Sequence, residues 1–562
     1  MQDVLREAIN EALTELGLPE IDFTIEHPSD LTHGDYASNV AMVVAKEAGK
    51  APREIAEQVR AALVDQIEYI EKIEVAGPGF LNFYLARDFF VKETVRALQE
   101  QDKWGRHDTW KGEKVVVEYT DPNPFKEFHI GHVFTNTVGE SIARLFMMAG
   151  AEVKRVNYQG DVGLHVACAL YGLQQMGITA DAELDAKLLG MAYARGATAN
   201  KEDETAQQRI REINKAVYER SDTDINALYD RGRAVSLEYF EDIYKLLGTQ
   251  FDDYFFESEA GPRGKEIVLS HPNIFPESEG AHVFKGEEYG LHTRVFLNKE
   301  GLPTYEAKEL ALAKLKEERL GEYDHSVVST SNEITEYFKV LLRAISLVYP
   351  ELAAKTEHIG HGTVRLSTGK MSSRTGQVIV GLDFISEIAD AAMQKMQASQ
   401  PDFQPDSILA QKIAIAAIKY ATLKGNILQD AVFDKEQALS FEGNSGPYLQ
   451  YTYARIQSVK EKAAKEGVSP QFAQVPTAPY EIERIIYRFT SVVASALADR
   501  EPHQLVTYLT TLASGFNTFY ANEKIADAGD EYAPYKLALA EAVAQTLKNG
   551  MWALGIEAPE RM

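Results

Sequence analysis

EYTDPNPFKEFHIGH occupies residues 118–132 of this 562-residue chain, directly before a helical pattern. It overlaps the end of VVVEY (115–119), whose continuous apolar and β-branched content suits a strand inside a parallel sheet. Gly131 has no side chain, and the unpaired N–H groups at the start of a helix favour phosphate, so this order predicts that a nucleotide approaches here. His129 and His132 add donors for charge that develops on transferring phosphate oxygens.

His-x-x-His also has explanations that involve no nucleotide, namely a pair on a helix surface or half of a metal site. The same four letters occur again at 358–361, which tests how specific the tetrapeptide is. The second copy lacks the strand and proline turn upstream, and it precedes GTVRL (362–366), a strand-like rather than helical pattern. We interpret the second copy as a coincidence.

LSTGKMSSRTG (366–376) is a loop rich in Gly, Ser and Thr that contains Lys370 and Arg374. Such a loop offers backbone donors and mobile cations to a pyrophosphate. A solvated surface turn is the alternative explanation for the loop taken alone.

Strand-like and helix-like patterns alternate from 115 to about 380, which predicts an α/β domain with a parallel sheet. Amphipathic patterns such as 408–428 and 481–498 predict helices, and no convincing strand follows about residue 382. The predicted domains are an α+β domain at 1–108, the α/β domain at 109–385 with a helical insertion around 165–260, and an all-helical domain at 386–562.

Composition limits the class of protein. The chain is 45% apolar and 25% charged, and it contains no apolar run near the roughly 18 residues of a membrane span. Its formal charge of −26 argues against a polybasic nucleic-acid binder, so any nucleic acid must meet local basic patches. The single cysteine, Cys168, excludes an internal disulfide framework, and the N-terminus resembles no targeting peptide. We expect a soluble, cytoplasmic enzyme.

Together these motifs resemble the class I aminoacyl-tRNA synthetases, and specifically the arginyl-tRNA synthetase family. The resemblance runs nearly end to end and implies a Rossmann-like catalytic domain, an N-terminal domain that touches the tRNA elbow, and a helical anticodon-binding domain. Besides the two loops above, it is carried by HPSDLTHGDYASNVAM (27–42), VAGPGFLNFYL (75–85), NYQGDVGLHV (157–166), FEGNSGPYLQYTYARIQS (441–458) and GIEAPERM (555–562).

The resemblance implies that His129, Gly131 and His132 bind ATP and stabilise the transition state. The loop residues with the matching role are Lys370, Met371, Ser372 and Arg374. One departure from the usual KMSKS pattern is that Ser373 replaces its second lysine. In arginyl enzymes that lack this lysine, one just upstream of the histidine motif substitutes, and Lys126 occupies that position. Without the motif, Lys126 would be an exposed loop lysine.

An arginine guanidinium needs carboxylates and amide oxygens in planar, bidentate contact. The residues that the resemblance and this need assign to arginine are Glu118, Asn123, Asp161, Tyr305 and Glu309. Two of the matched positions depart from the family: Glu309 replaces the usual Asp, and Lys308 the usual Arg. The alternatives are an ordinary solvated helix pair for Tyr305 and Glu309, and a turn-forming role for Asp161.

RNA contact is expected where local charge is favourable. Residues 451–465 carry four basic residues and one acidic residue beside several tyrosines, a combination used for single-stranded RNA. The residues predicted to contact tRNA are Phe80, Asn82, Tyr448, Tyr451 and Arg455. The alternative is that these aromatic residues are core residues.

The sequence therefore predicts ATP-dependent attachment of L-arginine to tRNA(Arg), with Mg²⁺ accompanying ATP. His129, His132, Lys126 and Lys370 would act by positioning and charge stabilisation. The resemblance also implies that activation needs bound tRNA, and a monomer is the default. Two alternatives stay open: an adenylating nucleotidyltransferase that acts on a small molecule, and a non-catalytic tRNA-binding paralogue.

Overall fold

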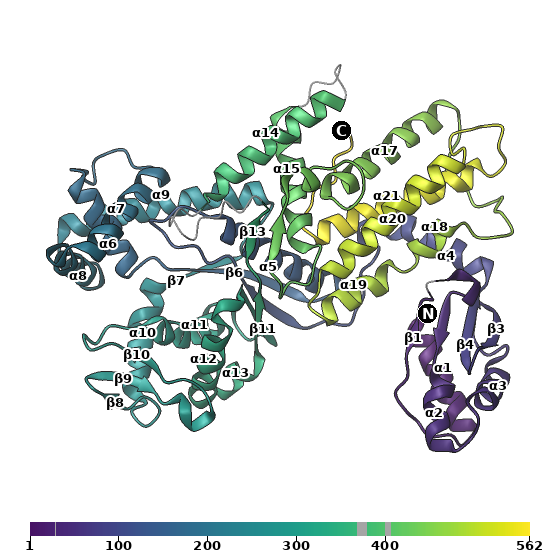
Figure 1. The fold of residues 1–562 in the computed structure, drawn as a ribbon, viewed down its shortest axis with the longest axis horizontal. Coiled ribbons are helices and arrows are strands. Elements are labelled where there is room, and N and C mark those ends of the chain that lie inside the picture. Colours follow the sequence, from purple (N-terminus) through teal and green to yellow (C-terminus); the bar gives the residue numbers. More distant parts are fainter. Residues whose placement is uncertain (29, 368–378, 400–405) are drawn as a thin grey trace. The chain divides into compact units, whose positions relative to one another are not determined.

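The computed structural model describes residues 1–28, 30–367, 379–399 and 406–562 (Figure 1). These residues form two compact units. Unit 1 consists of Met1–Trp104, Ile456–Phe489 and Ser514–Thr546, and unit 2 of Gly105–Arg455, Thr490–Ala513 and Leu547–Met562.

A five-stranded parallel sheet lies at the centre of unit 2, with the strand order β12-β11-β5-β6-β7. Val115, Val116 and Val117 of β5 are at most 1% exposed, because strands stand on both sides of β5 and helices cover the faces of the sheet. The strands are β5 (Lys114–Glu118), β6 (Glu152–Gln159), β7 (Asp253–Phe256), β11 (His325–Ser331) and β12 (Thr356–His361). Helix α5 (Ile130–Met148) connects β5 to β6. The predicted parallel-sheet fold class is confirmed.

Four helices separate β6 from β7 and form a group of their own (Figure 1). They are α6 (Leu164–Gln175), α7 (Ala186–Glu202), α8 (Glu204–Glu219) and α9 (Thr223–Leu247). Helices α6 and α7 pack backbone to backbone: a Cβ on Gly172 would lie 2.0 Å from the Ala192 carbonyl oxygen, and one on Gly196 would lie 1.8 Å from that of Cys168. Only glycine permits this approach, so α6 and α7 are a rigid pair.

A second insertion, which the sequence patterns did not reveal, lies between β7 and β11. Its three short antiparallel strands have the order β10-β9-β8. The elements are α10 (Glu257–Ser270), β8 (Glu277–Ser278), β9 (Ala281–Phe284), β10 (Arg294–Leu297) and α11 (Tyr305–Leu320), and α12 (Thr335–Val348) and α13 (Pro350–Lys355) follow β11. Strands of two to four residues are too short to show a period of two in the sequence.

The prediction that no strand follows residue 382 was wrong. Strand β14 (Ala431–Phe433) pairs in parallel with β13 (Val364–Leu366), far away in the sequence. The helix predicted over 481–498 is also interrupted, because turns at 487 and 488 separate two helices. The remaining helices are α14 (Gly381–Ser399), α15 (Ser407–Leu423), α16 (Lys435–Ala438), α17 (Gly446–Lys465), α18 (Glu481–Ile486), α19 (Phe489–Ala498), α20 (His503–Asn522) and α21 (Ala533–Ala553).

Unit 1 contains a four-stranded antiparallel sheet with the order β1-β2-β4-β3. Its helices bury one apolar face each, with Leu5, Ile9, Val40 and Ile55 fully buried beside Phe83 of the sheet. The elements are α1 (Gln2–Glu15), β1 (Ile25–Glu26), β2 (Tyr36–Ser38), α2 (Val40–Ala48), α3 (Pro52–Leu63), β3 (Ile70–Ala76), β4 (Phe80–Leu85) and α4 (Arg87–Glu100). In the part of the chain that the structure describes, no helix is both long and apolar enough to cross a membrane.

A buried carboxylate joins distant segments of unit 1. Glu483 of α18 is 1% exposed. It accepts hydrogen bonds from both terminal nitrogens of Arg87 on α4, at 2.7 and 3.3 Å, and from the Tyr535 hydroxyl of α21, at 2.7 Å. The Tyr480 amide donates a further bond at 3.0 Å. Removal of this carboxylate would therefore remove all four hydrogen bonds at once.

We predict that Glu483→Ala destabilises unit 1 by about 3 kcal/mol, because it leaves the Arg87 guanidinium without its buried partner. Urea unfolding followed by circular dichroism measures the change in midpoint. Glu481→Ala is the matched control, since Glu481 begins the same helix and is exposed. Equal effects of the two substitutions would contradict the assignment.

Candidate active site

The connection from β5 to α5 is strained. Thr120, Asp121 and Phe125 have φ values of 84°, 47° and 68°, a left-handed conformation that residues other than glycine rarely adopt. Three neighbours hold it: the Asn136 amide donates to the Thr120 hydroxyl (3.0 Å), the Tyr158 amide to the Asp121 carboxylate (2.9 Å), and the Phe125 amide to the Ser236 hydroxyl (2.9 Å). These neighbours belong to α5, β6 and α9, so the sheet, its first helix and the insertion jointly fix this loop.

His129 and His132 cap the start of α5 reciprocally. The backbone N–H of each donates to Nδ1 of the other, at 3.2 and 3.3 Å, and the rings stack with centroids 3.6 Å apart. A Cβ on Gly131 would lie 2.9 Å from Nδ1 of His129. Glycine at this position therefore keeps the space against the His129 ring clear.

Both imidazoles are neutral donors. Burial, reinforced by the charge of Lys126, lowers the pKa of His129 to about 4, and burial also lowers the pKa of His132 well below its usual value. Because Nδ1 of each ring accepts a backbone N–H, the single proton of each ring must reside on Nε2. Two Nε2–H groups are thus available to phosphate oxygens without a change of protonation.

The chain that follows the predicted loop lies beside this histidine pair. The Ile130 amide donates to the Ile379 carbonyl (3.0 Å), and the Gly381 amide to the Phe128 carbonyl (2.6 Å). Lys370, Met371, Ser372 and Arg374 themselves lie outside the described residues, so their assignment stays a prediction.

The second His-Ile-Gly-His copy has a different environment. It forms β12, where the His358 ring stacks on Phe338 and bonds the Thr330 hydroxyl (2.7 Å), and Nδ1 of His361 bonds the Gly362 carbonyl (2.7 Å). This copy starts no helix, so it lacks the orphan N–H groups that give the first copy its chemistry.

Lys126 lies half-buried beneath the insertion. Its amine is 4.8 Å from the centre of the Tyr193 ring on α7, and burial lowers its pKa. Within the described ranges, neither an ion pair nor a side-chain hydrogen bond engages this amine. A cation without an anionic partner, next to two neutral donors, suits an incoming phosphate.

Four carboxylates gather next to these groups: Glu118 at the end of β5, Asp121 in the strained loop, Glu257 after β7 and Glu309 on α11. Two buried lysines accompany them. Lys316 contacts Glu118 at 2.5 Å, and Lys308 contacts Glu257 at 2.6 Å, all four side chains being at most 5% exposed. Four acids against two bases would leave this cluster negatively charged if every carboxyl group were ionised.

Two of these carboxyl groups have raised pKa values, which favours their protonated, neutral form. Burial, followed by repulsion from Glu118, raises the pKa of Glu309 and of Asp121 well above the usual carboxyl range, although Lys316 opposes the shift. The hydroxyls of Tyr158 and Tyr337 are buried without a hydrogen-bond partner among the described residues, and both lie close to the Glu309 carboxyl. Unpaired hydroxyls beside protonated carboxyls indicate a site built for a polar, cationic ligand.

The predicted arginine residues are placed unequally. Glu118 and Glu309 belong to the carboxylate cluster. Asn123 lies beside it, because both Asn123 and Glu257 approach Gly160: a Cβ on Gly160 would lie 2.3 Å from Asn123 Oδ1 and 3.5 Å from the Glu257 carboxyl carbon. Tyr305 is 59% exposed at the start of α11, with its ring centre 5.3 Å from the amine of Lys308.

Asp161 does not offer a free carboxylate, which differs from the expectation that it binds arginine. It is fully buried and accepts from Arg233 Nε (2.7 Å) and from the amide and hydroxyl of Ser258 (2.8 and 2.7 Å). With both oxygens occupied, Asp161 fixes the segment that carries Glu257.

Several pocket residues were missed by the sequence analysis. Glu257 directly follows β7 at the carboxyl edge of the sheet, where ligands bind in open α/β folds, so its position carried a signal. Asp121 stood inside the quoted motif, but its proximity to Glu309 depends on the fold. Lys316 and Tyr193 lie on helices with no local feature that marks them.

The predicted tRNA contacts fall in both units. In unit 2, Tyr448, Tyr451 and Arg455 lie along one stripe of α17, and Arg455 stacks 4.8 Å from the centre of the Tyr451 ring. In unit 1, Phe80 is partly exposed at the start of β4, whereas Asn82 is 4% exposed at its centre. Of that pair, only Phe80 presents accessible surface in this conformation.

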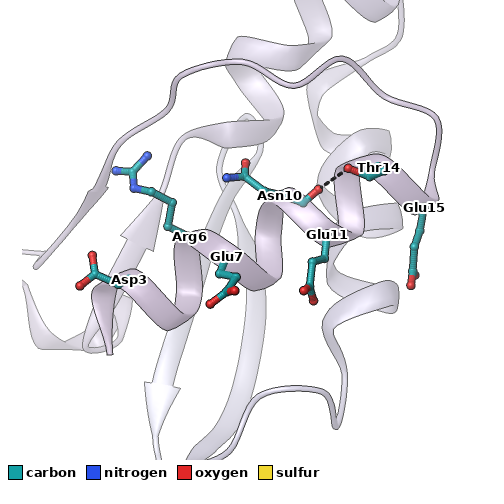
Figure 2. Close-up of a pocket in the computed structure, with 7 residues that line it drawn as sticks. All are labelled: Asp3, Arg6, Glu7, Asn10, Glu11, Thr14 and Glu15. Carbon is teal, nitrogen blue, oxygen red and sulfur yellow. Dashed lines mark hydrogen bonds between the residues drawn. The ribbon is translucent and has the colours of Figure 1, made fainter.

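An open groove on α1 in unit 1 is a different kind of surface (Figure 2). Figure 2 shows its lining side chains along one side of the helix: Asp3, Arg6, Glu7, Asn10, Glu11, Thr14 and Glu15. Four carboxylates against one arginine repel phosphate, so this face is unsuited to RNA.

The fold is that of a class I aminoacyl-tRNA synthetase. Residues 94–435 match the family model "tRNA synthetases class I (R), catalytic domain", residues 449–562 the "DALR anticodon binding domain", and residues 3–85 the "Arginyl tRNA synthetase N terminal domain". The chain belongs to the arginyl-tRNA synthetase family.

Full-length relatives agree with this assignment. The chain is 32% identical to an arginine–tRNA ligase of Pseudomonas entomophila, with 100% of both chains covered, and 30% identical to one of Clostridium beijerinckii, with 98% of this chain and 97% of the relative covered. Arginyl-tRNA synthetase of Thermus thermophilus has a similar structure, with a TM-score of 0.81, 27% identity and full coverage of both chains.

We predict that His129 and His132 both remain neutral at about pH 6, each with its proton on Nε2. Imidazole ¹⁵N NMR of histidine-labelled protein measures this, with His129→Gln and His132→Gln used to assign the signals. A doubly protonated ring at that pH would contradict the reciprocal cap, because an N–H at Nδ1 cannot accept the backbone bond.

Proposed function

We propose that this chain catalyses arginine–tRNA ligation, in which L-arginine is activated with ATP and then transferred to the 3′ end of tRNA(Arg). One observation carries the assignment of the site: a cluster of four buried carboxyl groups, two of them with raised pKa values, lies next to neutral phosphate donors at the start of α5. The substrate of the first step has matching ends, since arginine is cationic at its side chain and anionic at the carboxylate that must meet ATP.

In the first step, a carboxylate oxygen of arginine attacks the α-phosphorus of ATP, and the bond to pyrophosphate breaks. Arginyl-adenylate and pyrophosphate result. The Nε2–H groups of His129 and His132 donate to the phosphate oxygens as charge develops on them, and Lys126 adds a positive charge. The predicted loop residues, Lys370 to Arg374, would neutralise the leaving pyrophosphate. No side chain becomes covalently modified.

The guanidinium of arginine would occupy the carboxylate cluster. Glu309 and Glu257 supply acceptors for its N–H groups, and Tyr305 stands at the entrance. Glu118 and Asn123, close to the histidine pair, would hold the α-amino end and direct the carboxylate towards ATP. Glu309 is one methylene longer than the usual Asp, and Lys308 is ion-paired to Glu257, so both departures remain compatible with a cationic ligand.

In the second step, a ribose hydroxyl at the 3′ end of tRNA attacks the carbonyl carbon of the adenylate, and AMP leaves. Tyr448, Tyr451 and Arg455 would stack on bases and contact phosphates of the anticodon region, and Phe80 would contact the tRNA elbow. The acidic charge of the whole chain confines RNA to such local surfaces.

Mg²⁺ would arrive as the complex with ATP. Among the described residues, no cluster of three or more His, Cys, Asp or Glu side chains is arranged to hold a metal ion. Phosphate oxygens and water would therefore supply most of its ligands, as is usual for Mg²⁺ at nucleotide sites. We also propose that the enzyme is monomeric and cytoplasmic.

We predict that arginine binding releases a proton from Glu309. Its raised pKa keeps the carboxyl protonated while no ligand is bound. A bound guanidinium would stabilise the ionised carboxylate and outweigh the repulsion from Glu118, Asp121 and Glu257. Arginine affinity should therefore rise as the pH increases above the usual carboxyl range. Calorimetry in buffers of different ionisation enthalpy measures the released proton.

Glu309→Gln should abolish this pH dependence and weaken arginine binding by about 3 kcal/mol, roughly a hundredfold, because the ligand loses a charged partner. Glu318→Gln on the same helix is the control, since Glu318 is exposed and pairs with Arg263 at the surface. A pH-independent wild-type affinity would contradict the role of Glu309.

Arginine-dependent exchange of pyrophosphate into ATP tests the proposed function. Each of the twenty amino acids is assayed with and without total tRNA. Exchange with arginine alone is the expected outcome, and dependence on tRNA would identify the family's mechanism in this chain. Exchange with another amino acid would make Glu309 and Lys308 determinants of a different specificity. No exchange with any amino acid, together with tRNA binding, would overturn the proposal.

A further inference from the structure

We propose that Tyr193, in the helical insertion, is a positioning residue for adenylate formation that holds the amine of Lys126 towards the phosphate site. This inference rests on the proposed function, in which Lys126 contacts phosphate. It concerns a residue some 60 positions further along the chain than the histidine motif, on helix α7.

The first support is the contact itself. The Lys126 amine faces the Tyr193 ring at 4.8 Å from its centre, within the range of a cation–π interaction. Both side chains are partly buried, and such contacts strengthen as water is excluded. In the described ranges the amine has no carboxylate partner, so the ring is the group that determines where it points.

The second support is the rigidity of the helix that carries Tyr193. Gly172 and Gly196 lock α6 against α7 on either side of position 193, with carbonyl oxygens only 1.8 to 2.0 Å from where a Cβ would stand. Helix α7 also contacts the neighbouring loop residue, because a Cβ on Gly190 would lie 2.9 Å from Glu127 Oε2. One face of α7 therefore packs over residues 126 and 127, and Tyr193 cannot move freely.

The third support is the charge distribution around Lys126. The positive charge of Lys126 lowers the pKa values of His129, His132 and His165, and it also lowers that of Glu257. A flexible lysine between these groups could turn towards the Glu257 carboxylate of the arginine pocket. The Tyr193 ring opposes this by giving the amine a favourable position against α7, close to the histidine pair.

A double-mutant cycle tests the inference. Pyrophosphate exchange is measured for the wild type, Tyr193→Leu, Lys126→Ala and the double variant, with ATP and arginine varied separately. We expect Tyr193→Leu to lower kcat/KM for ATP about tenfold, with KM for arginine unchanged, and to have no more than about a twofold effect once Lys126 is Ala. Tyr193→Phe should retain most of the activity because it keeps the ring.

Met191→Ala is the matched control, since Met191 lies on the same helix and is 54% exposed. It should leave the rate unchanged. If Tyr193→Leu fails to fold, Tyr193→Met replaces it in the cycle, as it fills similar volume without a ring.

The outcomes separate the inference from the proposed function. Equal effects of Tyr193→Leu in the presence and absence of Lys126 would overturn the positioning role, as would a Tyr193→Phe variant as impaired as Tyr193→Leu. A Lys126→Ala variant with the wild-type rate would overturn the role of Lys126 and this inference with it. Loss of arginine-dependent exchange in the wild type would instead overturn the proposed function.

Discussion

The strained connection between β5 and α5 is the constraint on which the rest of unit 2 depends. Three left-handed residues without the freedom of glycine cost about 1–3 kcal/mol each, and such a conformation persists only where the surroundings over-determine it. Here α5, β6 and α9 each contribute one hydrogen bond to the loop. This loop places Asp121 in the carboxylate cluster and then leads into the His129–His132 cap of α5. Its fixed conformation therefore holds the carboxylate cluster and the histidine pair at a set distance from each other.

The two halves use opposite electrostatic means. One half concentrates carboxyl groups, of which two are ion-paired with buried lysines and two have raised pKa values. The other half holds its histidines neutral, and its Lys126 amine has no ion pair within the described residues, so these donors need no rearrangement to meet a phosphate. A chain with a net charge of −26 can thus bind a nucleotide and RNA, because each contact is built locally.

The insertion between β6 and β7 belongs to the architecture of the site. Ser236 of α9 holds the strained loop, Arg233 of the same helix holds Asp161, and Tyr193 of α7 faces Lys126. Asp161 illustrates the change in interpretation: the sequence suggested a ligand carboxylate at the sheet edge, and the structure gives it three internal partners. Glu257, which precedes the Ser258 that bonds Asp161, is ion-paired with Lys308 in the carboxylate cluster.

The sequence by itself determined the fold class from its alternating strand and helix patterns, and the family from motifs that resemble it nearly end to end. It also predicted a phosphate site at the start of α5, because a buried strand, a turn and a helix follow one another directly there. Glu118, Asn123 and Lys126 could be proposed because the family resemblance assigns roles to these positions of the motif. Only the tertiary structure decided that Asp121, Glu257, Glu309 and Lys316 share one pocket, since their charges interact through space between elements that are distant in the chain. The pairing of β13 with β14, the protonation of Glu309 and the contact between Lys126 and Tyr193 likewise depend on long-range packing, which no local pattern encodes.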